Sequence, residues 1–212
     1  MRKFLRVLGW TTLVVVVIVG GLRFTLLDAW TIPVDDPILS ASMAPNLAGG
    51  DFVLLYRATP KFGDLVRCTD PEEPTRYVVG RILGEPGDTV ELSSTDITIN
   101  GKRSYPDMTC AKTRVPVDNP TTGAPEELHC AVEAAGGHKH MRATKLGGAM
   151  IPQGKRTVSE GNVFLISDNR VWPMDSRQYG AVPRATCKEQ IFFRVYGKAG
   201  LGDVETRFIY IR

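Results

Sequence analysis

Two serines near the start of the chain have types and spacing that suit covalent chemistry. Ser40 and Ser42 are separated by one alanine, and Met43 and Pro45 follow closely. A serine hydroxyl becomes an effective nucleophile only when a neighbouring general base accepts its proton. Serines beside a proline are also typical of ordinary turns. The pair therefore indicates a site only if other segments supply the remaining groups.

Other motifs that would carry chemistry are incomplete. The run Gly154-Lys155-Arg156 lacks the upstream glycine and the Ser/Thr of a phosphate-binding loop, and the chain has no Gly-x-Ser-x-Gly motif. His138 and His140 could together reach one metal ion, but a histidine pair in a Gly-rich segment is more often solvated. We therefore expect neither a metal ion nor a cofactor.

The N-terminal segment predicts how the body of the chain is held. Val7–Leu22 is an uncharged run of 16 residues. As a helix it is about 24 Å long, shorter than the roughly 30 Å core of a bilayer. The apolar segment can be counted from Phe4 if Arg6 extends its guanidinium to the headgroups. It becomes longer at the other end if Arg23 extends its guanidinium in the same way. Basic residues before the run predict a cytoplasmic N-terminus and a body outside the membrane.

Two alternatives compete with an anchor. A cleavable signal peptide has the same basic start and apolar middle, but no Ala-x-Ala-like cleavage site follows Gly20-Gly21. A buried soluble helix fits the β-branched run and the charge asymmetry less well. We therefore expect an uncleaved, single-pass anchor in the cell (inner or cytoplasmic) membrane. It contacts the lipid bilayer and leaves the body on the extracytoplasmic side.

The charge distribution argues against nucleic acid as a partner. The chain has 26 Lys and Arg and 23 Asp and Glu, and four of the basic residues precede Asp28. The 22 basic residues of the body nearly balance its 23 acidic ones. The body therefore lacks the excess of positive charge with which proteins contact phosphates.

The four cysteines lie in a body that we expect in an oxidising compartment, where disulfides persist. None of them forms a Cys-x-x-Cys pair, which argues against zinc. Cys110 and Cys130 bracket a stretch rich in Pro, Gly and Thr, so we expect a disulfide between them. Cys68 and Cys187 lie in strand-like runs and form either a second bridge or two buried thiols.

After the anchor the pattern is mostly that of strands. Short apolar runs bounded by Gly and Pro predict strands, and Asn100-Gly101 is a strong hairpin-turn signal. Residues 103–157 have little apolar periodicity and indicate an irregular lobe. We expect an all-β body. The runs are residues 51–56, 64–68, 77–83, 89–92, 96–99, 163–166 and 190–195.

Four segments, in this order along the chain, resemble the sequence boxes of the bacterial type I signal peptidases, serine endopeptidase family S26. The resemblance covers about residues 1–102 and 158–197. The boxes are Pro37–Leu47 with its serines and Met-Ala-Pro, the Gly-Asp-strand pieces at 50–54 and 63–66, Gly80–Val90, and Ser167–Gly180 with Asp-Asn-Arg and Asp-Ser-Arg.

The resemblance implies a β-rich catalytic core with an inserted second β lobe, behind one N-terminal transmembrane helix. We therefore expect four parts: the cytoplasmic tip and anchor at 1–27, the first part of the core at 28–102, the inserted lobe at 103–157, and the second part of the core at 158–212.

The resemblance also implies roles for individual residues. Ser42 would be the nucleophile that cleaves signal peptides of exported proteins after small residues, and Ser40 would help bind the oxyanion. Substrate would lie extended between the Ser40–Met43 segment and the strand around Val78–Gly80. In that arrangement Met43, Val78 and Val79 would contact the substrate, and the pairs Arg81–Asp168 and Asp175–Arg177 would hold the scaffold together.

The sequence departs from the family at the general base. The family has a lysine where this chain has Gly80, and a serine that positions this lysine where the chain has Pro173. If another group supplies the base, the candidates come from the lobe and its border. The spacing of these residues along the chain favours none of them over the others. These are Lys102, Lys112, Lys139, Lys145, His138 and His140.

Three functional hypotheses follow. In the first, the chain is a membrane-anchored signal-peptidase-like serine endopeptidase, which is the function that the resemblance implies. In the second, it is a pseudopeptidase that binds an extended segment of an exported protein as a chaperone or assembly factor. In the third, it is a structural membrane-anchored β protein that uses neither the serine nor a groove.

Overall fold

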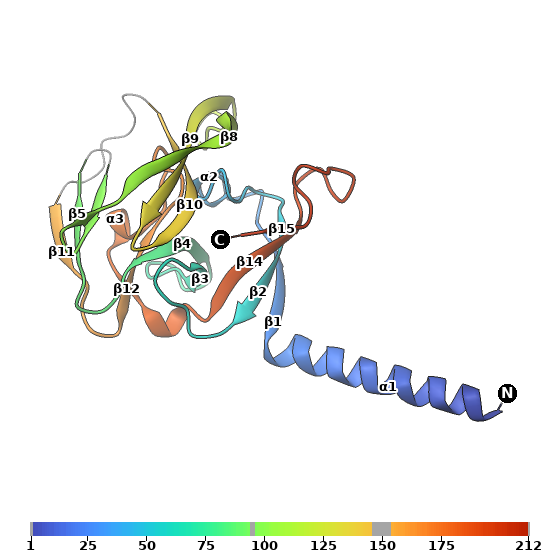
Figure 1. Ribbon diagram of the computed structural model, residues 1–212. Helices are drawn as coiled ribbons and strands as arrows, with labels where there is room; N and C mark the ends of the chain where they lie inside the picture. The colour runs from blue at the N-terminus through green and yellow to red at the C-terminus, as the bar shows by residue number, and fades with distance from the viewer. Residues whose placement is uncertain (1, 94–95, 146–153, 212) are drawn as a thin grey trace.

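The computed structural model describes residues 2–93, 96–145 and 154–211. A long helix, α1 (Arg2–Thr25), extends away from a β-rich body (Figure 1). The expected all-β class of the body is confirmed: sheets make up most of it, and its helices are short. These are α2 (Pro37–Ser42), α3 (Ser176–Tyr179) and the 3₁₀ helix η1 (Arg184–Thr186).

An antiparallel eight-stranded sheet forms the centre of the body. Its strands run in the order β1-β2-β14-β3-β4-β12-β13, and β15 pairs with β14. The strands are β1 (Leu27–Thr31), β2 (Phe52–Arg57), β3 (Leu65–Thr69), β4 (Tyr77–Gly84), β12 (Asn162–Ile166), β13 (Val182–Pro183), β14 (Glu189–Tyr196) and β15 (Ile209–Tyr210).

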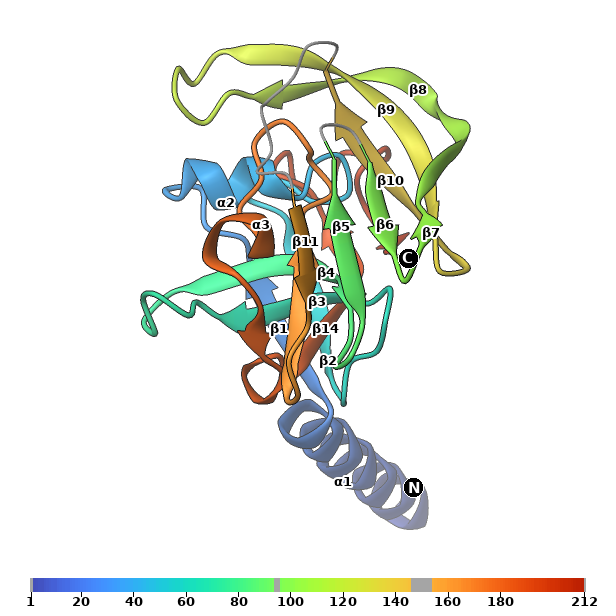
Figure 2. The ribbon, with the colours of Figure 1, turned by 90° about the vertical axis from the view of Figure 1, so that its left-hand side faces the viewer.

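Two smaller sheets complete the body. One has the order β11-β5-β6-β7, and the other is the lobe sheet, with the order β10-β9-β8. Figure 2 shows the lobe sheet crossing one end of the body. The strands of the first are β5 (Thr89–Leu92), β6 (Ile97–Ile99), β7 (Lys102–Arg103) and β11 (Gly154–Thr157); those of the lobe sheet are β8 (Tyr105–Asp118), β9 (Pro125–Ala135) and β10 (His138–Thr144).

The lobe is more regular than its sequence indicated. β8 is mostly exposed, with Cys110 and Val117 as its buried positions, so it lacks the strict alternation that marks a half-buried strand. Pairing with β9 supplies the order that the local pattern does not show. A disulfide between Cys110 and Cys130 joins the two strands, and a second joins Cys68 to Cys187.

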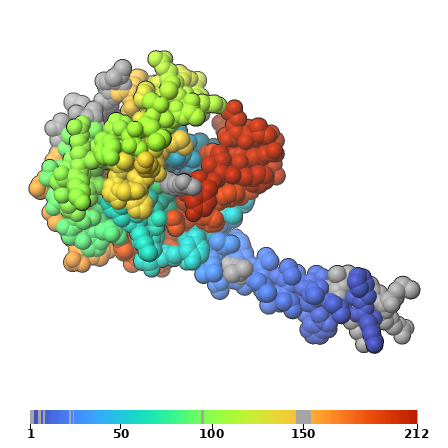
Figure 3. Space-filling model, viewed as in Figure 1, coloured from blue at the N-terminus to red at the C-terminus, as the bar shows by residue number. Residues whose placement is uncertain are grey.

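The expected membrane-spanning helix is not confirmed. Within the part of the chain that the structure describes, no helix combines the length and the apolar content needed to cross a bilayer. The large apolar side chains described on α1, such as Trp10 and Val17, are exposed. Figure 3 shows α1 standing clear of the body over most of its length.

The segment that carries the two serines is held from two sides. Leu39, Met43 and Leu47 are buried in the main core with residues of β2, β3 and β4. Ala41 and Ala44 pack instead against Leu128 and other apolar side chains at the lobe. Burying one large aliphatic side chain contributes about 1.5–3 kcal/mol, so this short helix is positioned by its packing rather than by its length.

Removing the disulfide between Cys110 and Cys130 by a double substitution to Ser should lower the free energy of unfolding by about 3 kcal/mol, because the bridge closes a short loop. Removing the bridge between Cys68 and Cys187, whose separation is 119 residues, should cost about 5 kcal/mol, since a longer loop loses more entropy when closed. Urea unfolding of both double variants measures this. A larger loss for the shorter loop would contradict the expectation.

Candidate functional site

The helix α2 begins where its sequence supplies a cap. The side chain of Asp36 accepts a hydrogen bond from the backbone N–H of Leu39 (2.9 Å), and Pro37 occupies the first turn, where its missing N–H costs nothing. Arg76 donates to the other oxygen of Asp36 (2.6 Å). The cap at Asp36, four residues before Ser40, therefore fixes the start of the helix.

Ser42 lies at the C-terminal end of α2 and is fully buried. Its Oγ donates to the carbonyl of Leu39, at 3.1 Å. The backbone N–H of Asn169 donates to the Ser42 carbonyl, and Asn169 Nδ2 donates to that of Ala41, both at 2.9 Å. The hydroxyl is thus held inside the turn, and it must leave the Leu39 carbonyl before it can attack a substrate.

Ser40 lies two residues earlier and is half-buried. Its Oγ donates to the carbonyl of Pro33, at 2.8 Å. A hydroxyl has one proton to donate, so in this conformation the proton that would stabilise an oxyanion is used by the backbone. Both serine hydroxyls are therefore in a resting arrangement, each bound to a carbonyl of its own segment.

Gly80, at the position expected for the base, is buried in β4. A Cβ atom at this position would lie only 2.9 Å from Leu165 Cβ. The pairing of β12 with β4 shifts register between Phe164 and Leu165, and the side chain of Leu165 lies against Gly80. The strand thus has a physical reason for glycine here, independent of the chemistry, and a lysine would fit only if β12 moved.

The two scaffold pairs that we expected lie buried in the structure. Arg81 donates to both oxygens of Asp168 (3.0 and 2.9 Å), and Arg177 donates to Asp175 Oδ2 (2.6 Å). Burial by itself raises the pKa of Asp168, but Arg81 and His140 outweigh it, and the net shift is downward. Burial likewise raises the pKa of Asp175, but Arg177 outweighs it, and the net shift is again downward.

A second charged cluster joins the lobe to the core, and sequence reasoning missed it. Glu133 of β9 accepts from Arg142 (2.9 Å) and from Ser104 (2.9 Å), and its other oxygen accepts from Arg170. No local signal could have identified this cluster, because its members come from separate segments. Burial raises the pKa of Glu133, but Arg170, His140 and Arg142 together lower it well below its usual value.

His140 connects this cluster to the first. Its Nε2 lies 3.2 Å from Glu133 Oε2 and 3.7 Å from Asp168 Oδ1, and its side chain is almost completely buried. Burial lowers the pKa of His140 and Arg81 lowers it further, while Asp168 and Glu133 raise it, with a net lowering. His140 is therefore a buried structural group at the lobe–core contact.

Within the described part of the chain, the Ser42 hydroxyl donates to the carbonyl of Leu39, and none of the six alternative bases forms a hydrogen bond with it. His138 packs against the ring of Phe62, and His140 lies in the buried cluster. Lys102 is exposed. The other lysines form ion pairs at 2.6 Å: Lys112 with Glu205, Lys139 with Asp107 and Lys145 with Glu126.

A groove of about 540 Å³ lies beside the start of α2. Among the described strands, Tyr77–Gly80 of β4 pairs with β3 alone, since β12 begins its pairing with β4 at Arg81. This stretch therefore has no described strand paired along its other edge. Tyr77 is exposed and lines the groove, whereas the three residues that follow it are buried. The lining residues are Trp30, Pro33, Asp35–Leu39 and Thr75–Tyr77.

The expected substrate contacts at Met43, Val78 and Val79 stay a prediction, and the structure limits it to their main chain. The side chains of Met43, Val78 and Val79 are buried in the core rather than directed into the groove. Strand residues alternate between the two faces of a sheet while their main chain stays at its edge. Only the backbone of this strand is thus available for pairing with a peptide.

Replacing Gly80 by Ala should destabilise the fold by about 1–3 kcal/mol, because the added methyl group meets Leu165 at 2.9 Å in a packed core. The matched control is Gly202→Ala, where the new Cβ meets nothing within 4 Å. Urea unfolding measures both variants. Equal stability of Gly80→Ala and the native chain would show that the site has room for a side chain.

The stability of the fold should fall as the pH drops below about 6.5, the pKa of an unfolded histidine. The folded pKa of His140 is lowered, so the unfolded chain binds a proton that the folded chain refuses, and acid favours unfolding. Urea unfolding between pH 5 and 7.5 measures the slope, which should be shallower in His140→Gln. Identical slopes in the two proteins would contradict this.

Comparison with known proteins gives consistent matches. The family model described as "Signal peptidase, peptidase S26" matches residues 5–196. Mitochondrial inner membrane protease subunit 1 of Schizosaccharomyces pombe is 26% identical, over 73% of this chain and 68% of its own length. Signal peptidase I of Pseudomonas fluorescens is 28% identical, over 78% and 60%. Signal peptidase I of Bacillus licheniformis is 31% identical, over 64% and 61%.

These alignments leave about a third or more of each relative unmatched, because they span 60–68% of the relatives' lengths. The family model, in contrast, extends over most of this chain, including the serine segment and the buried Asp168–Arg81 pair. The chain therefore belongs to the signal peptidase family, peptidase S26.

Proposed function

We propose that this protein is a serine endopeptidase of the signal peptidase I type, which cleaves signal peptides from exported proteins after small residues. The observation that carries the proposal is the open edge of β4 at Tyr77–Gly80, beside the groove and facing the helix that bears Ser42. Family membership supports the reaction class, and the groove supports the extended form of the substrate.

The peptide would add to β4 as a further strand. An exposed sheet edge offers unpaired N–H and C=O groups, which bind an extended peptide through its main chain. Two half-exposed apolar side chains line the groove, Ile38 from α2 and Tyr77 from β4. They would contact alternate side chains of the substrate.

Ser42 would be the nucleophile, and Ser40 would assist at the oxyanion. Both hydroxyls first have to exchange their present acceptors, the carbonyls of Leu39 and Pro33. Asn169 holds the carbonyls of Ala41 and Ser42, so it would keep the helix end in place while the Ser42 hydroxyl turns toward the groove. Asn169 thus has a positioning role.

A second candidate is binding of the same extended segment without turnover. Two observations favour it: Ser42 Oγ is buried against a backbone carbonyl, and the position expected for the base is a glycine packed against Leu165. The relatives named above are all called peptidases or a protease subunit and give this candidate no support. It rests on the geometry alone.

We also propose that α1 anchors the chain in the cell membrane as a single span, with the N-terminus in the cytoplasm. Because no described helix is long and apolar enough by itself to cross a bilayer, this span requires basic side chains near the ends of α1 to reach the headgroups. The exposed apolar side chains of α1 support contact with a membrane, and the Schizosaccharomyces pombe relative is named for one, the mitochondrial inner membrane. Two disulfides support an oxidising, extracytoplasmic compartment for the body. Within the body, residues 28–102 and 158–212 would form the core and 103–157 the inserted lobe.

The deciding experiment measures cleavage and binding of a fluorescent peptide that contains a small-residue cleavage site, using the full chain in phosphatidylcholine nanodiscs. A peptidase should cleave it, and Ser42→Ala should lower the rate by about 10³-fold or more. Ser159→Ala, at an exposed serine outside the groove, is the matched control and should leave the rate unchanged.

Binding without cleavage separates the two candidates. If the native chain binds the peptide and does not cleave it, and Ser42→Ala binds equally well, the second candidate replaces the first. Ile38→Glu, which puts a charge into the groove, should weaken binding in either case. A native chain that neither binds nor cleaves would overturn both candidates and leave the purely structural role.

A further inference from the structure

A second and larger cavity, of about 850 Å³, lies at the other end of α2. Its walls come from Ser40, Ala41 and the turn that follows them, from the lobe strands β8 and β9, and from the C-terminal segment around Thr206. The groove is lined instead by Asp35–Leu39 and by β4, so the two spaces share only Pro37. The groove therefore does not account for this cavity, although Ser40, the proposed oxyanion residue, lies in the cavity wall.

The lining of the cavity suits a hydrocarbon chain better than a polypeptide. A peptide carries a donor and an acceptor at each residue, and these groups need partners when they are buried. Four of the lining residues are prolines, which have no backbone N–H to offer. The prolines are Pro37, Pro45, Pro116 and Pro120, and the other apolar walls include Val34, Ala44, Leu47, Val115 and Met141.

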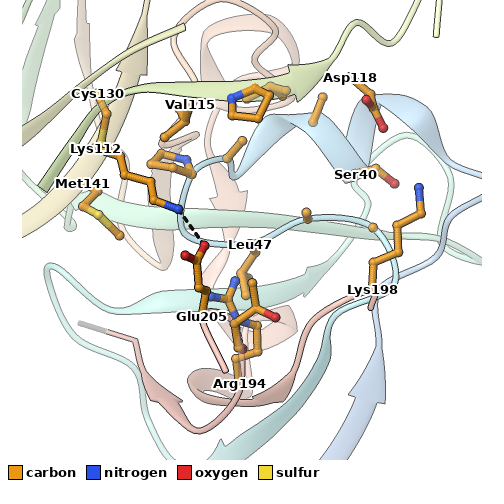
Figure 4. A pocket seen from close by; sticks show the side chains of 18 of the residues that line it. Ser40, Leu47, Lys112, Val115, Asp118, Cys130, Met141, Arg194, Lys198 and Glu205 are labelled. Carbon is orange, nitrogen blue, oxygen red and sulfur yellow. Dashed lines mark hydrogen bonds and ion pairs between the residues drawn. The ribbon is translucent and has the colours of Figure 1, made fainter. Parts of the chain in front are cut away.

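Most of the charged groups around the cavity already have partners. Arg194 donates to Asp51 (3.0 Å) and to the carbonyl of Thr206 (2.9 Å). Lys112 of β8 forms an ion pair with Glu205 of the C-terminal segment (2.6 Å), drawn as a dashed line in Figure 4. That pair joins the lobe to the C-terminal segment beside the cavity.

Lys198 differs from these groups. Its exposed side chain extends along the cavity, and its ammonium group comes to the end marked by Ser40 and Asp118 (Figure 4). Among the described residues it forms no ion pair. A space of this size, mainly apolar and with an available positive charge at its end, has the general form of a small-molecule site.

We propose that this cavity binds a long-chain carboxylate, with the hydrocarbon chain between α2 and the lobe strands and the carboxylate at Lys198. Asp118 lies on the β8 wall at the same end and repels the carboxylate, so it sets an upper limit on the affinity. The proposal does not depend on catalysis by Ser42 or on peptide binding in the groove.

The test is photolabelling of the full chain in phosphatidylcholine nanodiscs with a diazirine-bearing hexadecanoate, mapped by mass spectrometry. Saturable labelling should fall on the cavity walls, and unlabelled hexadecanoate should compete. Competition by shorter chains should weaken by about fourfold for each methylene removed, the value expected for a buried CH₂ group.

Variants test the two ends of the ligand separately. Ala111→Trp fills the cavity from an exposed position of β8 and should abolish saturable labelling, whereas Thr113→Trp, exposed on the same strand but outside the lining, should not. Lys198→Glu should raise the half-saturating concentration about tenfold, and Asp118→Asn should lower it. Lys188→Glu, exposed and outside the lining, is the matched charge control.

Three results would each overturn the proposal. Hexadecanol competing as well as hexadecanoate would show that no carboxylate is recognised. Labelling confined to α1 would show that the probe reports only the surrounding lipid. An apolar peptide that competes where hexadecanoate does not would make the cavity a peptide site. Cleavage measured on the same samples distinguishes these failures from a failure of the endopeptidase proposal, since that assay uses Ser42 and the groove.

Discussion

Asp168 is the buried charge on which the arrangement of the site depends. It accepts two hydrogen bonds from Arg81 and one from Asn46 (2.6 Å), and His140 of the lobe lies close by. Removing one partner of such a buried pair leaves an uncompensated charge, which costs about 3–5 kcal/mol. The next residue, Asn169, holds the end of α2. One buried carboxylate therefore links β4, the lobe and the serine segment.

This linkage explains why the serine segment is well positioned although α2 is short. A six-residue helix is not stable alone, yet its cap at Asp36, its packing through Leu39 and its tether to Asn169 determine its place. The same tether keeps the hydroxyl of Ser42 inside the turn. The contacts that position Ser42 therefore also restrain its hydroxyl, and a reaction at this hydroxyl would require a local change at the end of α2.

Two of the ionic connections between the lobe and the rest of the body differ in kind. One is the buried cluster of Glu133, Arg142 and Arg170, which is shielded from water. The other is the exposed ion pair of Lys112 and Glu205, whose attraction is screened by dissolved salt. The strong connection lies beneath the lobe sheet, and the weak one lies at the cavity beside it. Breaking the Lys112–Glu205 pair would thus leave the buried connection between the lobe and the core in place.

The sequence by itself determined what short stretches of chain encode. The strand runs were confirmed, and at Asn100-Gly101 both residues have positive φ (50° and 75°), as the predicted hairpin turn requires. The motif order identified the family and the two scaffold pairs. Only the tertiary structure decided that Leu165 lies against Gly80, that the Ser42 hydroxyl faces a carbonyl, and that Glu133 meets Arg170. The contacts of Leu165 and Glu133 depend on how segments far apart in the chain are placed, and local alternation carries no record of which distant strand will be the neighbour. The Ser42 contact is local, but it belongs to a short helix whose position is fixed by its packing.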